Sequence, residues 1–334
     1  MSPTEVIVVS GHRAASRAVA AARIARRAGC ARMPASPLPV PPADPAREAL
    51  GAIGVAHPPR VVLELPEDGC IESTIGMFAD AEDARIAEAI CVVDAASFFE
   101  DLFGDEYYPI AGAQPRLVVA KALRLVQQVE HASAVHIMGW EPIATADLSI
   151  LLATLSAIAP AARLHLEHPT HVEPSAVFDE IVHQPGWVQL LNHEHRPHMT
   201  DIRVSAFRYE QVRPFHPGRL HRLLERMGSG AFGAVIRSAG FCRLATRPGL
   251  VGSWDQVGQM IALQPLARDD GSAGDSLALG QEIGVIGIDL DVVTLEAALD
   301  RACLTDAEFS AGAAAWAKIA DPFPSWSAVS AAAD

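Results

Sequence analysis

Paired cysteines, long apolar runs and an excess of basic residues are all missing from this sequence of 334 residues. Its five cysteines lie far apart and form no C-x-x-C pair, which predicts reduced thiols and a cytoplasmic location. No apolar run approaches the length that a bilayer crossing requires. The first apolar stretch is interrupted at His12 and Arg13. We therefore expect neither a membrane partner nor an export signal.

Positive charge is scarce as well. The chain has 26 Lys and Arg against 40 Asp and Glu, and its formal net charge is −14. Direct nucleic-acid binding needs a clustered basic face, so we expect no direct nucleic-acid partner. Aromatic residues make up only 6% of the chain, yet half of all residues are apolar, which predicts a globular protein. The length suffices for two domains that each bury a core.

Short apolar strands alternate with helical stretches in the first half of the chain. This alternation predicts a mostly parallel sheet with helices on both faces, an α/β domain over residues 1–166. Residues 33–60 form a Pro- and Ala-rich loop up to Ala46, and residues 80–88 have a helical composition. The expected strands are residues 6–10, 60–65, 90–94, 134–138 and 163–166, and the other expected helices are a run ending at Arg27 and residues 117–130 and 146–158.

Strands cluster in the second half, with few helices between them. This pattern predicts an α+β domain with an antiparallel sheet over residues 201–334. Residues 167–200 are polar, irregular and rich in histidine, and we expect them to link the two domains. His216 stands between two prolines and is predicted to cap a helix. The expected strands are residues 202–209, 234–246, 256–263 and 282–288, and the expected helices are residues 216–227 and 293–303.

Residues 6–18 have the strand, turn and helix order with which nucleotide-binding domains carry a phosphate loop. Such a loop needs glycine at both ends, a lysine that reaches the phosphates and a hydroxyl for magnesium. Here Gly11 holds the first position and Ser16 stands at the second glycine. Arg17 replaces the lysine, and Ala18, which cannot ligate a metal, replaces the hydroxyl residue. A remnant nucleotide site and a plain packing turn both remain open, and the second is favoured.

Histidines near the end of the expected linker are candidate metal ligands. His193, Glu194, His195 and His198 lie within six residues. Imidazole and carboxylate are suitable zinc ligands, so zinc is a candidate cofactor here. The alternative is that exposed histidines simply fill a polar linker. We favour this alternative, because the cluster lacks the closed set of four ligands that a structural zinc site requires.

Long segments of the second half resemble a known family. Residues 213–220, 236–248 and 281–291 resemble, in this order, the C-terminal domain of the CobW family of GTPases and metallochaperones. The ending, with residues 304–308 and 321–326, is similar to the branch of that family tied to zinc limitation. The matches recur in the right order over about 130 residues, which makes them more specific than any single motif.

The first half is similar to the family's GTPase domain in outline, and departs from it at the working positions. The V-V-D-A segment that contains Asp94 is retained, but the switch motif keeps only Glu64 and the guanine motif keeps only an acid, Glu141. The family's G-C-x-C-C metal motif has no counterpart. The resemblance implies a remnant nucleotide site made of Gly11, Ser16, Arg17, Glu64, Asp94 and Glu141.

The resemblance also implies a function. A chain with decayed GTPase motifs and an intact C-terminal domain is expected to be a pseudo-GTPase of zinc homeostasis or the zinc-starvation response. It would act through a protein partner, without GTP or magnesium. Some bacterial relatives of this kind recruit a hibernation factor to the ribosome. The alternatives are a weakly hydrolysing metallochaperone that delivers zinc or cobalt to a client, and a maturation factor for one metalloenzyme.

Overall fold

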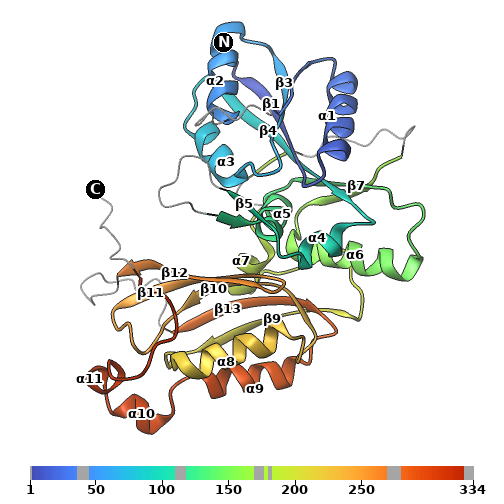
Figure 1. Cartoon of the computed structure of the whole chain (residues 1–334). Coiled ribbons are helices and arrows are strands. Elements are labelled where there is room, and N and C mark those ends of the chain that lie inside the picture. The colour runs from blue at the N-terminus through green and yellow to red at the C-terminus, as the bar shows by residue number, and fades with distance from the viewer. Residues whose placement is uncertain are drawn as a thin grey trace. The chain divides into compact units, whose positions relative to one another are not determined.

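The computed structural model describes residues 2–35, 45–109, 118–168, 177–179, 183–268 and 280–326 (Figure 1). Its chain divides into two compact units. The first comprises Met1–Gly186 and Arg196–Asp201, and the second comprises Trp187–His195 and Ile202–Asp334. Residues expected to form a linker are thus shared between both units, and they include a short helix, α7 (Gly186–Leu191).

The first unit is built on a six-stranded parallel sheet, as its sequence predicts. The strand order is β2-β3-β1-β4-β7-β8. The strands are β1 (Thr4–Ser10), β2 (Ala31–Met33), β3 (Arg60–Glu64), β4 (Ala84–Asp94), β7 (Ala134–Met138) and β8 (Arg163–Leu166). From β1 the chain continues to β2 and β3 on one side, and then to β4 on the other. The carboxyl ends of β1 and β4 therefore flank the topological switch point, where open α/β sheets bind ligands.

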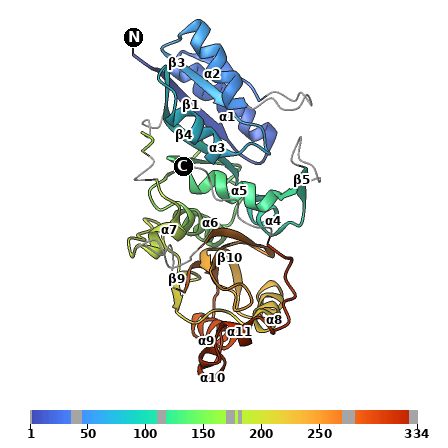
Figure 2. The same ribbon diagram turned by 90° about the vertical axis from the view of Figure 1, so that its left-hand side faces the viewer.

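Helices cover both faces of this sheet (Figure 1 and Figure 2). Val6 and Val8 pack against α2 (Pro45–Ala56) and α3 (Ile71–Ala79), whereas Ile7 and Val9 pack against α1 (Ala14–Ala28) on the other face. This two-residue alternation is what a strand buried on both faces requires. The remaining elements of the unit are α4 (Phe98–Phe103), β5 (Tyr107–Pro109), β6 (Val118–Ala120), α5 (Lys121–Glu130) and α6 (Thr145–Ile158).

The second unit holds a five-stranded antiparallel sheet in the order β12-β11-β10-β13-β9, which confirms the predicted fold class. Figure 1 shows α8 (Pro217–Gly228) and α9 (Val292–Ala302) side by side along one face of this sheet. A core with Phe215 and Trp254 at its centre lies between helices and sheet. The strands are β9 (Val204–Gln211), β10 (Ala234–Cys242), β11 (Leu250–Val257), β12 (Met260–Arg268) and β13 (Gln281–Ile288), and two short helices follow, α10 (Asp306–Ser310) and α11 (Ala313–Trp316).

Helix caps in this unit follow the sequence signals. His216 caps α8, and its side chain accepts a hydrogen bond from the backbone N–H of Arg219. Thr305 and Glu308 form a capping box at the start of α10. None of the helices that the structure describes combines the length and hydrophobicity that a membrane-spanning helix requires.

Two predicted elements are wrong, and a third, the helix expected over residues 117–130, begins only at Lys121 because Val118–Ala120 form β6. Residues 80–88 were expected to form a helix, but β4 begins at Ala84 and pairs with β1 along its length. Tertiary pairing overrides the helical composition of this stretch. Residues 256–263 were expected to form one strand, but a turn at Gly258, with φ of 53°, separates β11 from β12. Glycine at this position permits the left-handed backbone of a two-residue hairpin turn.

Candidate functional site

The turn between β1 and α1 is too short to enclose a phosphate. Only residues 11–13 separate the two elements, so Ser16 and Arg17 already lie within α1. Gly11 has φ of 147°, and a Cβ there would lie 2.5 Å from the carbonyl oxygen of Val92 on β4. Glycine is thus required for the close approach of two strands, and a role in holding phosphate is not needed to explain it.

Arg17 points into the protein, where its charge is already compensated. It is 4% exposed. Its Nη1 donates to the carbonyl oxygen of Gly11 at 2.6 Å, and its Nε donates to Oε1 of Glu64 at 3.3 Å. A second arginine, Arg32 on β2, places Nη2 3.4 Å from the other oxygen of Glu64. The side chain that the sequence offers to a phosphate is therefore engaged in an Arg17–Glu64–Arg32 ion cluster, in which Arg17 and Glu64 are buried and Arg32 is partly exposed.

Asp94 ends β4 at the switch point and is satisfied by neighbouring groups. Its Oδ2 accepts a hydrogen bond from the Ser16 hydroxyl at 3.3 Å, and its Oδ1 accepts one from the backbone N–H of Ala96 at 3.2 Å. A nucleotide-bound magnesium would need both this carboxylate and a hydroxyl at position 18. Ala18 supplies no ligand, so the residues at this place do not fit GTP with magnesium.

The structure brings together five of the six expected nucleotide-site residues. The contacts described above join Gly11, Arg17 and Glu64 in one group and Ser16 and Asp94 in another. Glu141 is exposed in the turn after β7, and no contact in the described part of the chain connects it to the others. The predicted guanine-reading position is therefore separate from this cluster.

A cavity of about 410 Å³ lies beside the switch point, and we call it the switch-point pocket. Its lining is strongly polar: His12, Arg13, Ala14, Glu67, Glu100, Asp101, Gly104, Glu106 and Lys121. The pocket lies next to the turn between β1 and α1, where the family's nucleotide would be expected. Its charges therefore bear directly on whether an anionic ligand can enter.

The cations of the switch-point pocket are neutralised by its own acids. Arg13 forms a two-point ion pair with Asp101, at 2.9 and 2.5 Å, and Lys121 pairs with Glu106 at 2.6 Å. Two further carboxylates, Glu67 and Glu100, have no cation of the lining to balance them. Burial lowers the pKa of His12, although nearby Asp101 opposes this effect, so the imidazole adds little positive charge at neutral pH. The lining is therefore negative and disfavours a triphosphate.

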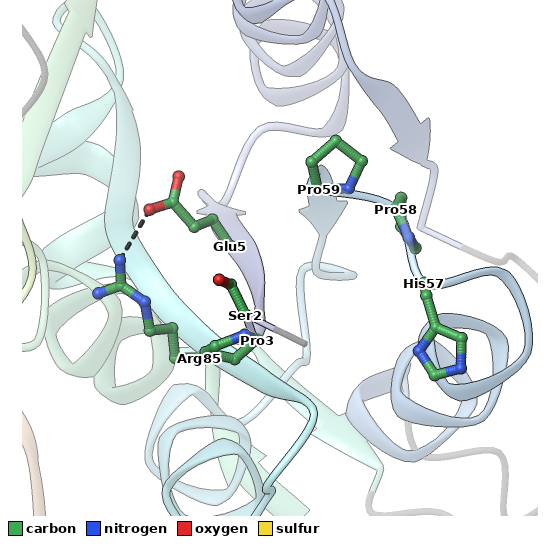
Figure 3. A pocket seen from close by; sticks show the side chains of 7 residues that line it. All are labelled: Ser2, Pro3, Glu5, His57, Pro58, Pro59 and Arg85. Carbon is green, nitrogen blue, oxygen red and sulfur yellow. Dashed lines mark hydrogen bonds and ion pairs between the residues drawn. The ribbon is translucent and has the colours of Figure 1, made fainter.

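A second hollow, of about 740 Å³, opens at the amino ends of β1, β3 and β4 (Figure 3). Prolines 3, 58 and 59 form much of its lining. Its charged groups are paired with one another, because Glu5 forms ion pairs with Arg85 and with the neighbouring Arg60. This edge of an α/β sheet is not the one that ordinarily binds ligands. We therefore assign no chemistry to it.

The candidate histidines are divided between the two compact units. His193 lies against the guanidinium of Arg208, a cation that opposes a metal ion there. His198 belongs to the other compact unit, with Nδ1 3.1 Å from the Ser156 hydroxyl and 3.2 Å from the carbonyl oxygen of Pro160. Glu194 and His195 complete the expected set. Within the residues that the structure describes, no group of three or more His, Cys, Asp or Glu is placed to hold a metal ion.

Three side chains that shape the site were not singled out from the sequence. Arg32 joins the ion cluster around Glu64, and Asp101 and Lys121 contribute to the charge of the switch-point pocket. Asp101 belongs to a segment that resembles the family, but nothing in its spacing indicates a pair with Arg13. Arg32 lies on a strand of three residues, which is too short for a periodic signal.

Comparison with known proteins shows the family of the second unit. Residues 204–303 match the family model described as the cobalamin synthesis protein cobW C-terminal domain. Among curated proteins, the chain is 28% identical over 285 residues to zinc-regulated GTPase metalloprotein activator 1 of Dictyostelium discoideum. This match covers 76% of the chain and 58% of the relative. The chain therefore spans little more than half the length of that protein.

Solved structures of the YjiA GTPase were also matched. The Zn(II)-bound form from E. coli is 13% identical, with a TM-score of 0.40, and the match covers 91% of this chain and all of that one. A Zn(II)-bound triple mutant of the same GTPase is 14% identical, with a TM-score of 0.41. The resemblance expected from the sequence is confirmed for the second unit, in which residues 204–303 match the CobW C-terminal domain.

Proposed function

We propose that this chain is a non-catalytic CobW-type protein, a pseudo-GTPase, that acts in zinc homeostasis or the response to zinc starvation by binding a protein partner. One observation carries the proposal. The arginine at the position of the phosphate-binding lysine is buried against Glu64, within the protein's own ion cluster. The negative lining of the switch-point pocket supports it. Hydrolysis would need a phosphate clamp and a held magnesium ion, and neither is provided by these residues.

The proposed role in zinc homeostasis rests on similarity to known proteins. The curated relative is named as a zinc-regulated GTPase and a metalloprotein activator, and the matched GTPase structures contain zinc. An activator of metalloproteins has a protein client, so the similarity to this relative also supports a protein partner. The partner would belong to the zinc-scarcity response, with a ribosome-associated hibernation factor as one candidate.

A competing proposal gives the chain weak GTP hydrolysis and the delivery of zinc or cobalt to a client metalloprotein. The Dictyostelium relative, which is named as a GTPase and a metalloprotein activator, favours it. The two proposals differ in a measurable way, because only the metallochaperone requires nucleotide turnover.

A tagged chain recovered from zinc-starved and zinc-replete cells tests the partner. We expect a protein that is enriched with the full chain in zinc-starved cells only. Recovery of the same background proteins from both cultures would contradict the zinc-linked role.

Zinc calorimetry tests the candidate ligands separately. We expect the wild-type chain and the His193→Ala/His195→Ala variant to give the same weak isotherm, because Arg208 lies against His193. A stoichiometric heat in the wild type that the variant loses would instead assign zinc to these histidines.

A further inference from the structure

Four arginines line a groove between α8 and α9 in the second unit. The groove has a volume of about 240 Å³. Its walls are Arg219, Arg222, Arg226 and Arg301, which we call the groove arginines. Its floor is Leu223, Ala298 and Ala302, each at most 5% exposed. No acidic residue lines it. In a chain with 14 more acids than bases, this concentration of positive charge is unusual.

The spacing of the arginines along α8 explains this concentration of positive charge. Positions 219, 222 and 226 fall at intervals of three and four residues, which places all three side chains on one face of the helix. Arg301 joins them from the last turn of α9. The small residues Ala298 and Ala302 let the two helices approach, so that the arginines of both border one groove.

Among the residues that the structure describes, only Arg219 of the four groove arginines has an acidic partner. Arg219 is held by Glu308 at 2.6 Å, and the guanidinium of Arg226 lies over the ring of Phe232 at 4.6 Å. Arg222 and Arg301 are exposed, and no ion pair with either is found within the described parts of the chain. By contrast, Arg13, Arg17 and Arg208 each face a carboxylate. The groove therefore keeps charge available for a partner.

The surroundings favour a short acidic peptide over nucleic acid. Exposed acids adjoin the groove arginines in sequence: Glu225 precedes Arg226, and Asp300 precedes Arg301. A phosphodiester chain that continued past the groove would meet these carboxylates and a net charge of −14. A peptide can place one or two carboxylates against guanidinium groups, which bind them in a two-point geometry, and direct its other side chains elsewhere.

We propose that the α8–α9 groove is a docking site for an acidic segment of a partner protein, with carboxylates paired to Arg222 and Arg301. This assignment rests on the proposed function only in that both give the chain a protein partner. It needs neither zinc nor nucleotide. Bidentate pairs of this kind are charge-assisted and short, so a few of them can orient a peptide in a groove two helical turns long.

A defined peptide tests the assignment by fluorescence anisotropy. The probe is a labelled synthetic peptide of about 12 residues, roughly three helical turns, with glutamates spaced for one face. The same peptide with glutamine in place of glutamate and a single-stranded oligonucleotide of equal charge are the competitors. The protein is the full chain as wild type, Arg222→Glu, Arg301→Glu and Arg268→Glu. Arg268 is exposed at the end of β12 and serves as the matched control.

The expected result is saturable binding of the glutamate peptide that each groove reversal weakens at least about tenfold, with Arg268→Glu close to wild type. The glutamine peptide and the oligonucleotide should not displace the probe. Absence of binding, equal loss in all three variants, or displacement by either competitor would overturn the assignment. Failure here with a zinc-linked partner still recovered removes only the groove assignment, whereas the reverse pattern removes only the proposed function.

Discussion

Arg17 is held where it cannot serve a ligand without breaking contacts of its own. Its guanidinium is buried with the carboxylate of Glu64 and the carbonyl oxygen of Gly11. To reach a phosphate, it would have to leave Glu64 buried with Arg32 as its remaining cationic neighbour. A buried carboxylate that loses a partner is costly, so the ion cluster competes directly with anion binding.

A double-mutant cycle tests this cluster. Glu64→Leu should destabilise the chain by about 3 kcal/mol, because it leaves the Arg17 guanidinium buried without a carboxylate. Arg17→Met should cost less, since Arg32 still balances Glu64. The double variant should lose clearly less than the sum of the two. Urea unfolding measures all three, and strict additivity would show that the two side chains do not interact.

A substitution at Gly11 tests whether the close packing against Val92 requires glycine at this position. Gly11→Ala should destabilise by more than about 2 kcal/mol, because the added Cβ meets the Val92 carbonyl at 2.5 Å in a backbone conformation that alanine disfavours. Gly29→Ala is the control: Gly29 has φ of 62° but open space around it, so about 1 kcal/mol is expected. Thermal unfolding compares the two. Equal small losses would remove the packing explanation for Gly11.

At the scale of the secondary-structure elements, an ion pair between Arg219 and Glu308 connects the short helix α10 to α8. Arg219 donates to both oxygens of Glu308, at 3.0 and 2.6 Å, and Glu308 also accepts the backbone N–H of Thr305 in the capping box. The Arg219 hydrogen bonds, followed by those within the capping box, lower the pKa of Glu308 to about 2. The carboxylate form is thus the one that holds these elements together.

The lowered pKa of Glu308 makes the stability of the protein depend on pH. Because this pKa is lowered in the folded state, the Glu308 carboxylate contributes fully to the free energy of unfolding above its ordinary pKa of 4.5. This contribution is lost as the pH falls towards about 2. Glu308→Gln should therefore cost about 1 kcal/mol at neutral pH, a modest figure because the pair is partly exposed. The cost should shrink as pH falls below 4.5. Unfolding curves at several pH values measure it, with Glu225→Gln as the exposed control. A cost that is constant with pH would contradict the assignment.

Sequence patterns predicted the elements whose signals are local. The apolar run of β1, the capped helices α8 and α10 and the parallel and antiparallel sheets all follow from periodicity and caps. The amino-terminal half of β4 was missed because its Ala and Glu residues favour a helix until β1 pairs with it. Gly11, Ser16, Arg17, Glu64 and Asp94 lie near the switch point, and their role in binding a nucleotide stays a prediction. That Arg17 and Arg32 both face Glu64 could not be read from positions so far apart in the chain.

On the scale of the whole molecule, the two units differ in what they retain. The second unit matches the CobW C-terminal domain over residues 204–303 and carries a groove lined by four arginines. The first keeps the sheet and the helices of its expected class, but its switch point is filled by its own side chains. The engagement of Arg17 with Glu64 and the arginine-lined groove of the second unit both support the binding role proposed above.

Titration of the full chain with a fluorescent GTP analogue and magnesium tests this account most directly. The E. coli YjiA GTPase is a suitable positive control. We expect no saturable binding in the micromolar range and no phosphate release above a heat-inactivated sample, because Arg17 is engaged with Glu64 and the adjacent pocket is negative. Micromolar binding, or turnover above that sample, would contradict the account and favour the metallochaperone.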